Sequence, residues 1–197
     1  MSTPLVFLAR IGSPHGVRGA LNVNLAGQHL RDFHGKNVSI CEPKNLVNGL
    51  LTDYGNARSI ELARVEPAHG DVQRVQFTGI NDRDAAAALT NQMIGAPLDA
   101  VRALAAAGRA EGEVPLSELW YFEMVGLSAT DAVSGQVIGE ITHVEDHGRN
   151  TVLTLSLANA VGGQHSVDIP LDYPGWQKAD VSQRKVMLTD WQIFLET

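Results

Sequence analysis

The chain is poor in cysteine and in long apolar runs. Its 197 residues include one cysteine, Cys41, which excludes an internal disulfide and a zinc site built from several cysteines. The apolar run over residues 4–9 follows no basic segment, and nowhere do the roughly 18 apolar residues of a membrane-spanning helix occur together. We therefore expect a protein that is neither exported nor membrane-bound and that works in the reducing cytoplasm.

The composition is that of a folded protein of more than one domain. Hydrophobic residues make up 44% of the chain and charged residues 19%, close to the globular average. A length of 197 residues exceeds the usual single-domain size of about 100 to 150 residues. The small, glycine-punctuated middle of the chain predicts a linker at residues 103–114, between domains at residues 1–102 and 115–197.

The net charge of −7 is unevenly distributed along the chain. Residues 1–100 carry nine lysines and arginines and nine acidic residues, whereas residues 101–197 carry six basic and 13 acidic residues. A domain of single sign repels anionic polymers and attracts basic partners. The second half is therefore expected to bind a basic protein and not naked RNA.

Short runs rich in β-branched residues recur between turn signals in the first half. The expected strands are residues 5–11, 20–25, 37–41, 49–54, 59–65 and 72–77. Asn81 or Asp82 can cap a helix over residues 82–89, which contains four alanines, and a second helix can form near residues 99–107. Six short strands at this spacing predict a β-barrel.

The second half repeats this pattern after a helical turn at residues 115–121. The expected strands are residues 127–130, 137–145, 151–157, 166–169 and 186–188. In residues 151–157 the leucines alternate with smaller residues, so one face is core, and Ser134-Gly135 and Gly148 supply tight turns. The predicted fold class is mainly β, with two small antiparallel β-barrel domains, a short linker and few short helices.

The densest turn-forming segment is Gly12 to Gly19. It lacks the G-x-x-x-x-G-K-[ST] and G-x-G-x-x-G patterns and no helix follows it, which disfavours a nucleotide site. The loop can be purely structural. Alternatively His15 and Arg18, together with Arg10, can face an RNA backbone, although no aromatic cluster is interleaved to stack bases.

The chain offers no convincing catalytic or metal site. His143 and His147 lie in a segment that is predicted to be strand and turn, where four residues span about 13 Å, too far for chelation by the pair. Cys41 lies in an expected strand with no local partner to lower its pKa, so it is expected in the core. No G-x-S-x-G elbow occurs. We expect no enzyme activity, metal or cofactor.

The segment Leu119 to Gly126 contains three adjacent aromatic residues, which cannot all face one core. They can close one end of a barrel, or some of them can anchor an interface, a role for which Trp and Tyr are enriched. Both roles can apply to different rings.

Several motifs recur here in the order found in a known family. The first is I-G-x-x-H-G-x-x-G within residues 6–19, the second is the D-R-x-x-A-x-x-L helix within residues 79–89, and the third is the aromatic segment at residues 119–126. With residues 135–141, 148–150 and 169–170, this ordered set resembles the RimM family of bacterial ribosome maturation factors. Leu119-Trp120 replaces a usual pair of tyrosines, and Thr151 replaces a common aspartate.

The resemblance implies a non-enzymatic assembly factor for the small (30S) ribosomal subunit, which binds the immature head and promotes 16S rRNA processing. It implies a C-terminal PRC-barrel domain that engages the nineteenth small-subunit ribosomal protein, with Leu119, Trp120 and Tyr121 at the interface. The acidic second half agrees with a basic partner.

Given the resemblance, we also expect the N-terminal barrel to face 16S rRNA or the pre-30S particle through Arg10, His15 and Arg18. The expected protein is a cytoplasmic monomer without membrane contact. Two other classes stay open: a PRC-barrel scaffold or interaction module outside the ribosome, and a small-molecule enzyme that uses the first barrel, since fold alone does not decide function.

Overall fold

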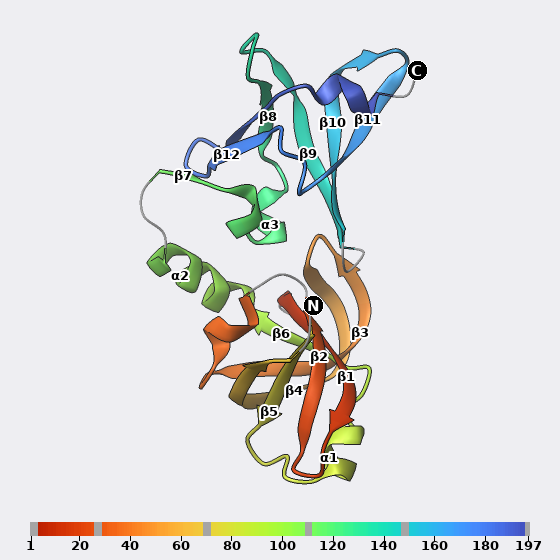
Figure 1. Cartoon of the computed structure of the whole chain (residues 1–197), viewed down its shortest axis with the longest axis vertical. Coiled ribbons are helices and arrows are strands. Elements are labelled where there is room, and N and C mark those ends of the chain that lie inside the picture. The colour runs from red at the N-terminus through yellow and green to blue at the C-terminus, as the bar shows by residue number, and fades with distance from the viewer. Residues whose placement is uncertain (1–3, 26–28, 69–71, 109–111, 147–149, 196–197) are drawn as a thin grey trace. The chain divides into compact units, whose positions relative to one another are not determined.

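β-strands dominate both halves of the chain, and the mainly β fold class predicted from the sequence is confirmed. The computed structural model describes residues 4–25, 29–68, 72–108, 112–146 and 150–195. It separates the chain into two units, Met1–Arg109 and Ala110–Thr197 (Figure 1). Among the described residues, no helix is long and apolar enough to cross a membrane.

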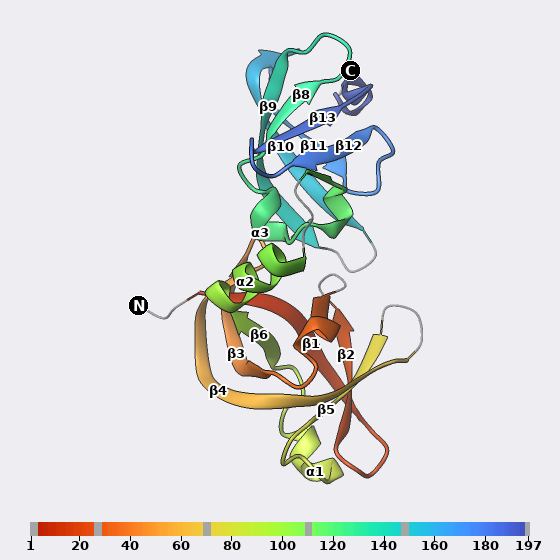
Figure 2. The ribbon, with the colours of Figure 1, turned by 90° about the vertical axis from the view of Figure 1, so that its left-hand side faces the viewer.

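The first unit is a closed six-stranded barrel. Its strands are β1 (Leu5–His15), β2 (Ala20–Leu25), β3 (Asn37–Val47), β4 (Leu50–Pro67), β5 (Val72–Phe77) and β6 (Met93–Pro97). They follow one another in the order β1-β2-β5-β4-β3-β6, and Figure 2 shows the long β4 curving round the barrel between β3 and β5. A 3₁₀ helix, η1 (His29–Phe33), connects β2 to β3.

Two differences from the predicted strands have a local cause. The segments expected at residues 49–54 and 59–65 form one strand, β4, because Gly55-Asn56 makes an irregularity within the strand and not a turn. Asn56 has a φ of 47°, and the register with β3 shifts nearby. β6 was not predicted from the sequence, because its first four residues are all buried and show no alternation of polar and apolar residues. It pairs with β1 and β3.

The core of the barrel follows the two-residue period of its strands. In β5, Gln73, Val75 and Phe77 are buried while the alternate residues are partly exposed. Ile11 and Leu21 are fully buried on neighbouring strands. Full burial of each such apolar side chain contributes roughly 1.5 to 3 kcal/mol to folding.

Both helices of the first unit form where the sequence predicts them, although the first ends at Ala87 and not at Leu89. Asp82 caps α1 (Arg83–Ala87), since its Oδ1 accepts a hydrogen bond of 2.7 Å from the backbone NH of Ala85. α2 (Leu98–Gly108) extends into the segment predicted as linker. The segment forms a helix although its hydrophobic periodicity is weak, because its alanines favour helix and the buried Val101 packs it against the first unit.

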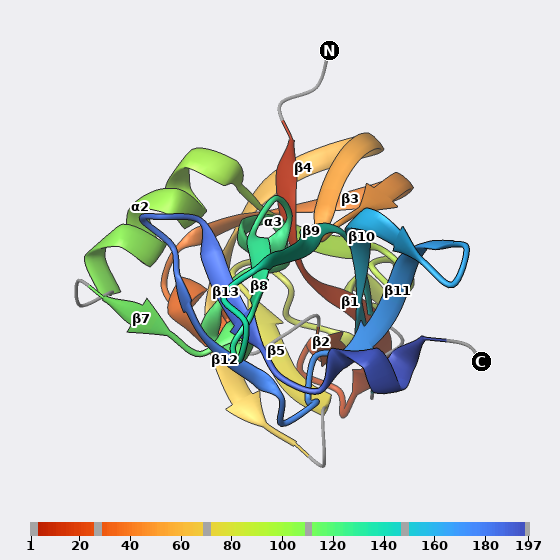
Figure 3. The same ribbon diagram turned by 90° about the horizontal axis from the view of Figure 1, so that it is seen from above.

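The second unit is a seven-stranded sheet. Its strands are β7 (Glu113–Val114), β8 (Ser128–Asp131), β9 (Val137–Asp146), β10 (Thr151–Val161), β11 (Gln164–Pro170), β12 (Trp176–Asp180) and β13 (Lys185–Leu188). The order is β11-β10-β9-β8-β13-β12-β7, which Figure 3 allows the reader to follow from above. β8 and β13 are parallel, unlike the all-antiparallel pattern expected, since β13 returns to β8 after a long connection.

Short helices frame this sheet, at η2 (Leu116–Glu118), α3 (Tyr121–Met124) and η3 (Trp191–Phe194). Leu153 and Leu155 of β10 are fully buried, which confirms the predicted inward face. The turn predicted at Ser134-Gly135 is present: Gly135 has a φ of 72°, and Asp131 Oδ1 accepts hydrogen bonds from the backbone and hydroxyl of Ser134. Gly148, the other predicted turn residue, lies outside the described residues.

Candidate functional site

The loop between β1 and β2 is held in place by its glycines. Gly16 and Gly19 have φ values of 65° and 79°, which glycine adopts without a steric penalty. A Cβ at Gly19 would overlap the carbonyl oxygen of Ile80, so the loop packs directly against the segment before α1. Arg83 adds a hydrogen bond of 3.2 Å from its Nη1 to the carbonyl of Gly16. The glycines of the first motif therefore have a structural role.

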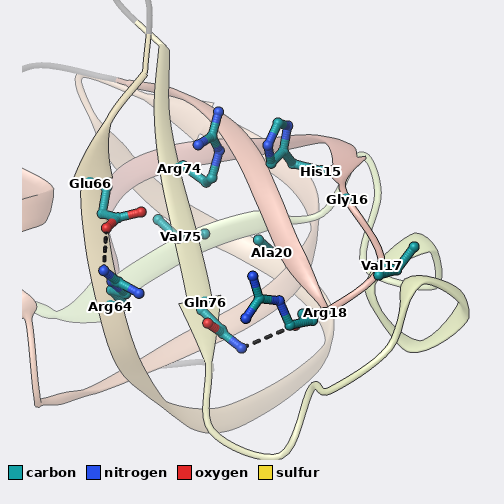
Figure 4. Close-up of a pocket in the computed structure, with 10 residues that line it drawn as sticks. All are labelled: His15, Gly16, Val17, Arg18, Ala20, Arg64, Glu66, Arg74, Val75 and Gln76. Carbon is teal, nitrogen blue, oxygen red and sulfur yellow. Dashed lines mark hydrogen bonds and ion pairs between the residues drawn. The ribbon is translucent and has the colours of Figure 1, made fainter.

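A hollow of about 420 Å³ lies beside this loop. Figure 4 shows side chains from the loop, β4 and β5 around it. Its charged and polar lining residues are His15, Arg18, Arg64, Glu66, Arg74 and Gln76. The hollow thus gathers three arginines and a histidine around one acidic residue.

Strand register brings the arginines of β4 and β5 together. Arg64 pairs with Gln76, and Glu66 pairs with Arg74, across the antiparallel β4–β5 ladder. Alternate residues of a strand leave opposite faces, so these four side chains lie outside the barrel while Val75 packs inside. Gln76 also donates a hydrogen bond of 3.0 Å from its Nε2 to the backbone carbonyl of Arg18, which ties the loop to β5.

The charge of the hollow is only partly compensated. Arg64 Nη2 lies 2.6 Å from Glu66 Oε1, and both side chains remain partly exposed, at 65% and 40%. Within the described part of the chain, neither Arg18 nor Arg74 has an acidic side chain within 4.0 Å. The Nε of Arg74 is buried and has no hydrogen-bond partner. The hollow therefore presents cationic donors to an anionic ligand.

Two of the three cations expected to face RNA line this hollow. His15 and Arg18 do, whereas Arg10 lies on β1 opposite Asn24 and outside the lining. Sequence reasoning missed Arg64 and Arg74. The two-residue spacing places Arg64 and Glu66 on one strand face, and Arg74 and Gln76 on another. That the two faces adjoin depends on the register between the strands, which the sequence does not give.

The aromatic segment of the second unit is mostly buried. Leu119 is 2% exposed and belongs to the core of the unit, and Trp120 is 6% exposed. The ring of Trp120 lies 6.4 Å from that of Phe122 at an interplanar angle of 32°. Glu123 Oε2 accepts a hydrogen bond of 3.0 Å from the backbone NH of Trp120, which fixes the start of α3. Half-buried Tyr121 and Phe122 are the more exposed rings of this segment.

Tyr121 joins α3 to the β9–β10 hairpin. Its hydroxyl donates to Asp146 Oδ2 at 3.2 Å and lies 3.2 Å from Thr151 Oγ1. Burial, with a smaller contribution from the carboxylate of Asp146, raises the pKa of Tyr121 to about 12. Thr151 is therefore a hydrogen-bond partner of an aromatic residue in the segment expected to bind a partner.

The other residues that the sequence analysis considered as a nucleophile or as metal ligands form no catalytic or metal site among the described residues. Cys41 is fully buried in β3, as predicted, and burial raises the pKa of its thiol to about 11. His147 lies outside the described residues. Among the described residues, no three His, Cys, Asp or Glu side chains come together in a way that could hold a metal ion.

Comparison with known proteins identifies the family. The profile of the RimM N-terminal domain matches residues 6–101. The ribosome maturation factor RimM of Acidiphilium cryptum is 31% identical over 185 residues, which cover 89% of this chain and 91% of that protein. The chain belongs to the RimM family.

Two further proteins are similar to most of the chain. RimM of Azorhizobium caulinodans is 28% identical over 94% of this chain and 90% of its own length. A crystal structure from Pseudomonas aeruginosa, of a protein described as a 16S ribosomal RNA processing protein RimM, is 21% identical and covers 94% of this chain and 96% of its own, with a TM-score of 0.37.

The RimM N-terminal domain profile spans the barrel from Val6 of β1 onward and the beginning of α2. The hollow lies entirely within this matched range, since its lining runs from His15 to Gln76. The candidate site thus belongs to the domain by which the family is recognised.

Proposed function

We propose that this RimM-family protein is a non-enzymatic assembly factor for the small ribosomal subunit, which binds the immature head and so promotes 16S rRNA processing. The supporting observation is how charge divides between the two units. Met1–Arg109 carries 11 basic and nine acidic residues, whereas Ala110–Thr197 carries four basic and 13 acidic residues. One unit thus suits RNA and the other a basic protein.

The acidic unit is proposed to bind the nineteenth small-subunit ribosomal protein. The aromatic segment supplies the anchor, with Leu119 in the core as its support, Trp120 beside Phe122, and Tyr121 partly exposed at its surface. Aromatic rings held by packing lose little conformational entropy when a partner covers them. Long-range attraction between the acidic unit and a basic partner speeds their encounter.

The barrel is proposed to face 16S rRNA in the pre-30S particle through Arg10, His15 and Arg18. All three side chains are exposed. Contacts of this kind neutralise phosphates and position the protein without reading sequence. The protein is proposed to act as a monomer in the cytoplasm and without a cofactor.

Such a factor accelerates assembly by stabilising one conformer of the immature head. It can shift the equilibrium only by the difference between its affinities for this conformer and for its competitors. Its affinity for the mature subunit must therefore be lower, so completion of the head displaces the protein.

The test is calorimetric titration of the full chain with the purified nineteenth small-subunit protein across a salt series. We expect binding that weakens with salt, and a loss of more than about 1 kcal/mol in the Trp120→Ala variant. Trp176→Ala, which removes a partly exposed ring elsewhere in the same unit, is the matched control. Circular dichroism verifies that both variants fold. Absence of binding by the folded wild type would refute the proposed partner.

A further inference from the structure

The hollow beside the β1–β2 loop has features that the family assignment does not explain. Arg74 and Arg18 extend into it from different elements, and Arg64 completes the group from β4 (Figure 4). We propose that this hollow binds the phosphate backbone of RNA without regard to sequence, with Arg18 and Arg74 as the contacts and Glu66 as a restraint on Arg64. This inference rests on the proposed function and names the surface that serves it.

The donor chemistry favours phosphate. A guanidinium is always charged and presents its NH groups in a planar fork that matches two phosphate oxygens. Arg74 lines the hollow and has no acidic side chain within 4.0 Å among the described residues, so a phosphate would pair with a charge that the free protein leaves uncompensated. A volume of about 420 Å³ lies within the range of small-ligand sites, roughly 300 to 1,000 Å³, and leaves room for a phosphate with its ribose.

The surroundings favour a polymer over a single phosphate. Arg74 pairs with Asn22 across β2–β5, and Arg10 pairs with Asn24 across β1–β2. Asn22 and Asn24 lie two residues apart on β2, about 7 Å, so amides and guanidinium groups form a row on the outer face of the barrel. An extended phosphodiester chain can follow such a row out of the hollow. Arg10 does not line the hollow, but as part of this row it can contact the phosphodiester chain outside it.

The lining indicates backbone recognition and not base reading. No Phe, Tyr or Trp side chain lines the hollow among the described residues, so the large stacking platforms of base-binding proteins are missing there. The polar groups are mainly long cations, which contact phosphates irrespective of the bases. The site should therefore bind different single-stranded sequences with similar affinity.

Glu66 limits the affinity of this site. It pairs with Arg64 on its own strand and lies opposite Arg74 in the register. A phosphate entering the hollow meets the repulsion of this carboxylate and competes with it for Arg64. Weak, reversible contact suits a factor that must leave the subunit when the head is complete.

The experiment measures binding of the full chain to a fluorescent uridine homopolymer across a potassium chloride series. Arg18→Gln and Arg74→Gln are each expected to weaken binding on the order of tenfold at low salt, and to reduce the slope of log affinity against log salt by about 0.7. Arg58→Gln, which removes the same charge from an exposed position of β4 outside the hollow, is expected to have a much smaller effect. Arg18 lies in an exposed loop, so its variant tests the site even if Arg74→Gln perturbs the barrel.

The outcomes for the hollow and for the proposed function can be told apart. Equal losses of RNA affinity in all three variants would show that net charge alone attracts RNA. Displacement of the labelled RNA by polyglutamate as efficiently as by unlabelled RNA would point to an acidic protein as the ligand. Either result overturns the inference. Absence of RNA binding with retained binding of the ribosomal protein refutes the hollow and the proposed rRNA contact of the barrel, and leaves the assembly role through the ribosomal protein standing. Arginine-dependent RNA binding without binding to the ribosomal protein or the pre-30S particle supports the hollow as an RNA site and refutes the proposed function.

Discussion

Arg64 and Glu66 form an ion pair of 2.6 Å within a single strand, on the outer face of the barrel. The two residues are two positions apart on β4, so both side chains leave the same face. Across the ladder Glu66 lies opposite Arg74, whose guanidinium has no acidic partner within 4.0 Å among the described residues. The carboxylate of Glu66 thus forms an ion pair with Arg64 and lies on the strand position opposite Arg74.

Removing this carboxylate should strengthen RNA binding. In Glu66→Gln the hollow loses its negative charge and Arg64 becomes available, so we expect affinity for the uridine homopolymer to rise about threefold or more, with a steeper salt dependence. Fluorescence anisotropy measures both quantities. Glu42→Gln, at an exposed position of β3, is the matched control and should change affinity little. Unchanged affinity in Glu66→Gln would contradict the restraint assigned to Glu66.

Tyr121→Phe should destabilise the second unit. The variant leaves the ring in place and removes the hydroxyl that contacts Asp146 and Thr151, at an expected cost of about 0.5 to 1.5 kcal/mol. Urea unfolding followed by tryptophan fluorescence measures this loss selectively, because all three tryptophans lie in Ala110–Thr197. Thr151→Val, which removes the other hydroxyl of this contact, is the companion variant. A double variant that loses no more than the larger single loss would show that the two hydroxyls act together.

Cys41 should be unreactive in the folded protein. Burial raises the pKa of its thiol from 9.0 to about 11, so at pH 8.5 the thiolate is far scarcer in the folded chain than in the unfolded chain. We expect alkylation by iodoacetamide to be slower than in urea on the order of a hundredfold, from ionisation alone. Mass spectrometry reads this unambiguously because the chain has one cysteine. Equal rates in the two states would show that Cys41 is accessible.

The same shift predicts how stability depends on alkaline pH. The folded pKa lies above the unfolded pKa, so the stabilising contribution of the neutral thiol is fully present below pH 9 and is lost as pH rises toward 11. Cys41→Ala removes this titration. The difference in unfolding free energy between wild type and variant should therefore be constant at neutral pH and should shift against the wild type between pH 9 and pH 11.

Gly19→Ala and Gly16→Ala form a matched pair in one loop. Both glycines have positive φ, so each substitution costs on the order of 1 kcal/mol in backbone strain. Only at Gly19 would the new Cβ also overlap the carbonyl of Ile80, whereas nothing lies within 4 Å at Gly16. Differential scanning calorimetry should show a clearly larger loss for Gly19→Ala. Equal losses would mean that the loop does not pack tightly against Ile80.

Much of the local structure could be predicted from residues that are neighbours in the chain. Two strands, residues 20–25 and 72–77, begin and end where the alternation of their residues predicts. Asp82 caps its helix because an aspartate before an alanine run can accept a backbone hydrogen bond three residues later. These features depend on neighbours in the chain, and the ordered motifs that indicated the RimM family are local in the same sense.

Contacts between segments that are distant in the chain could not be predicted in this way. Alternation placed Arg64 and Glu66 on one strand face, but the register between β4 and β5 determined that Arg74 lies opposite Glu66. The continuation of β4 through Gly55-Asn56 and the parallel pairing of β8 with β13 likewise depend on partner strands. The physical reason is that a strand face is set by a period of two residues, whereas register is set by closing the sheet, to which every strand contributes. Half of the cationic hollow could thus be named from the sequence, through His15 and Arg18, and the other half could not.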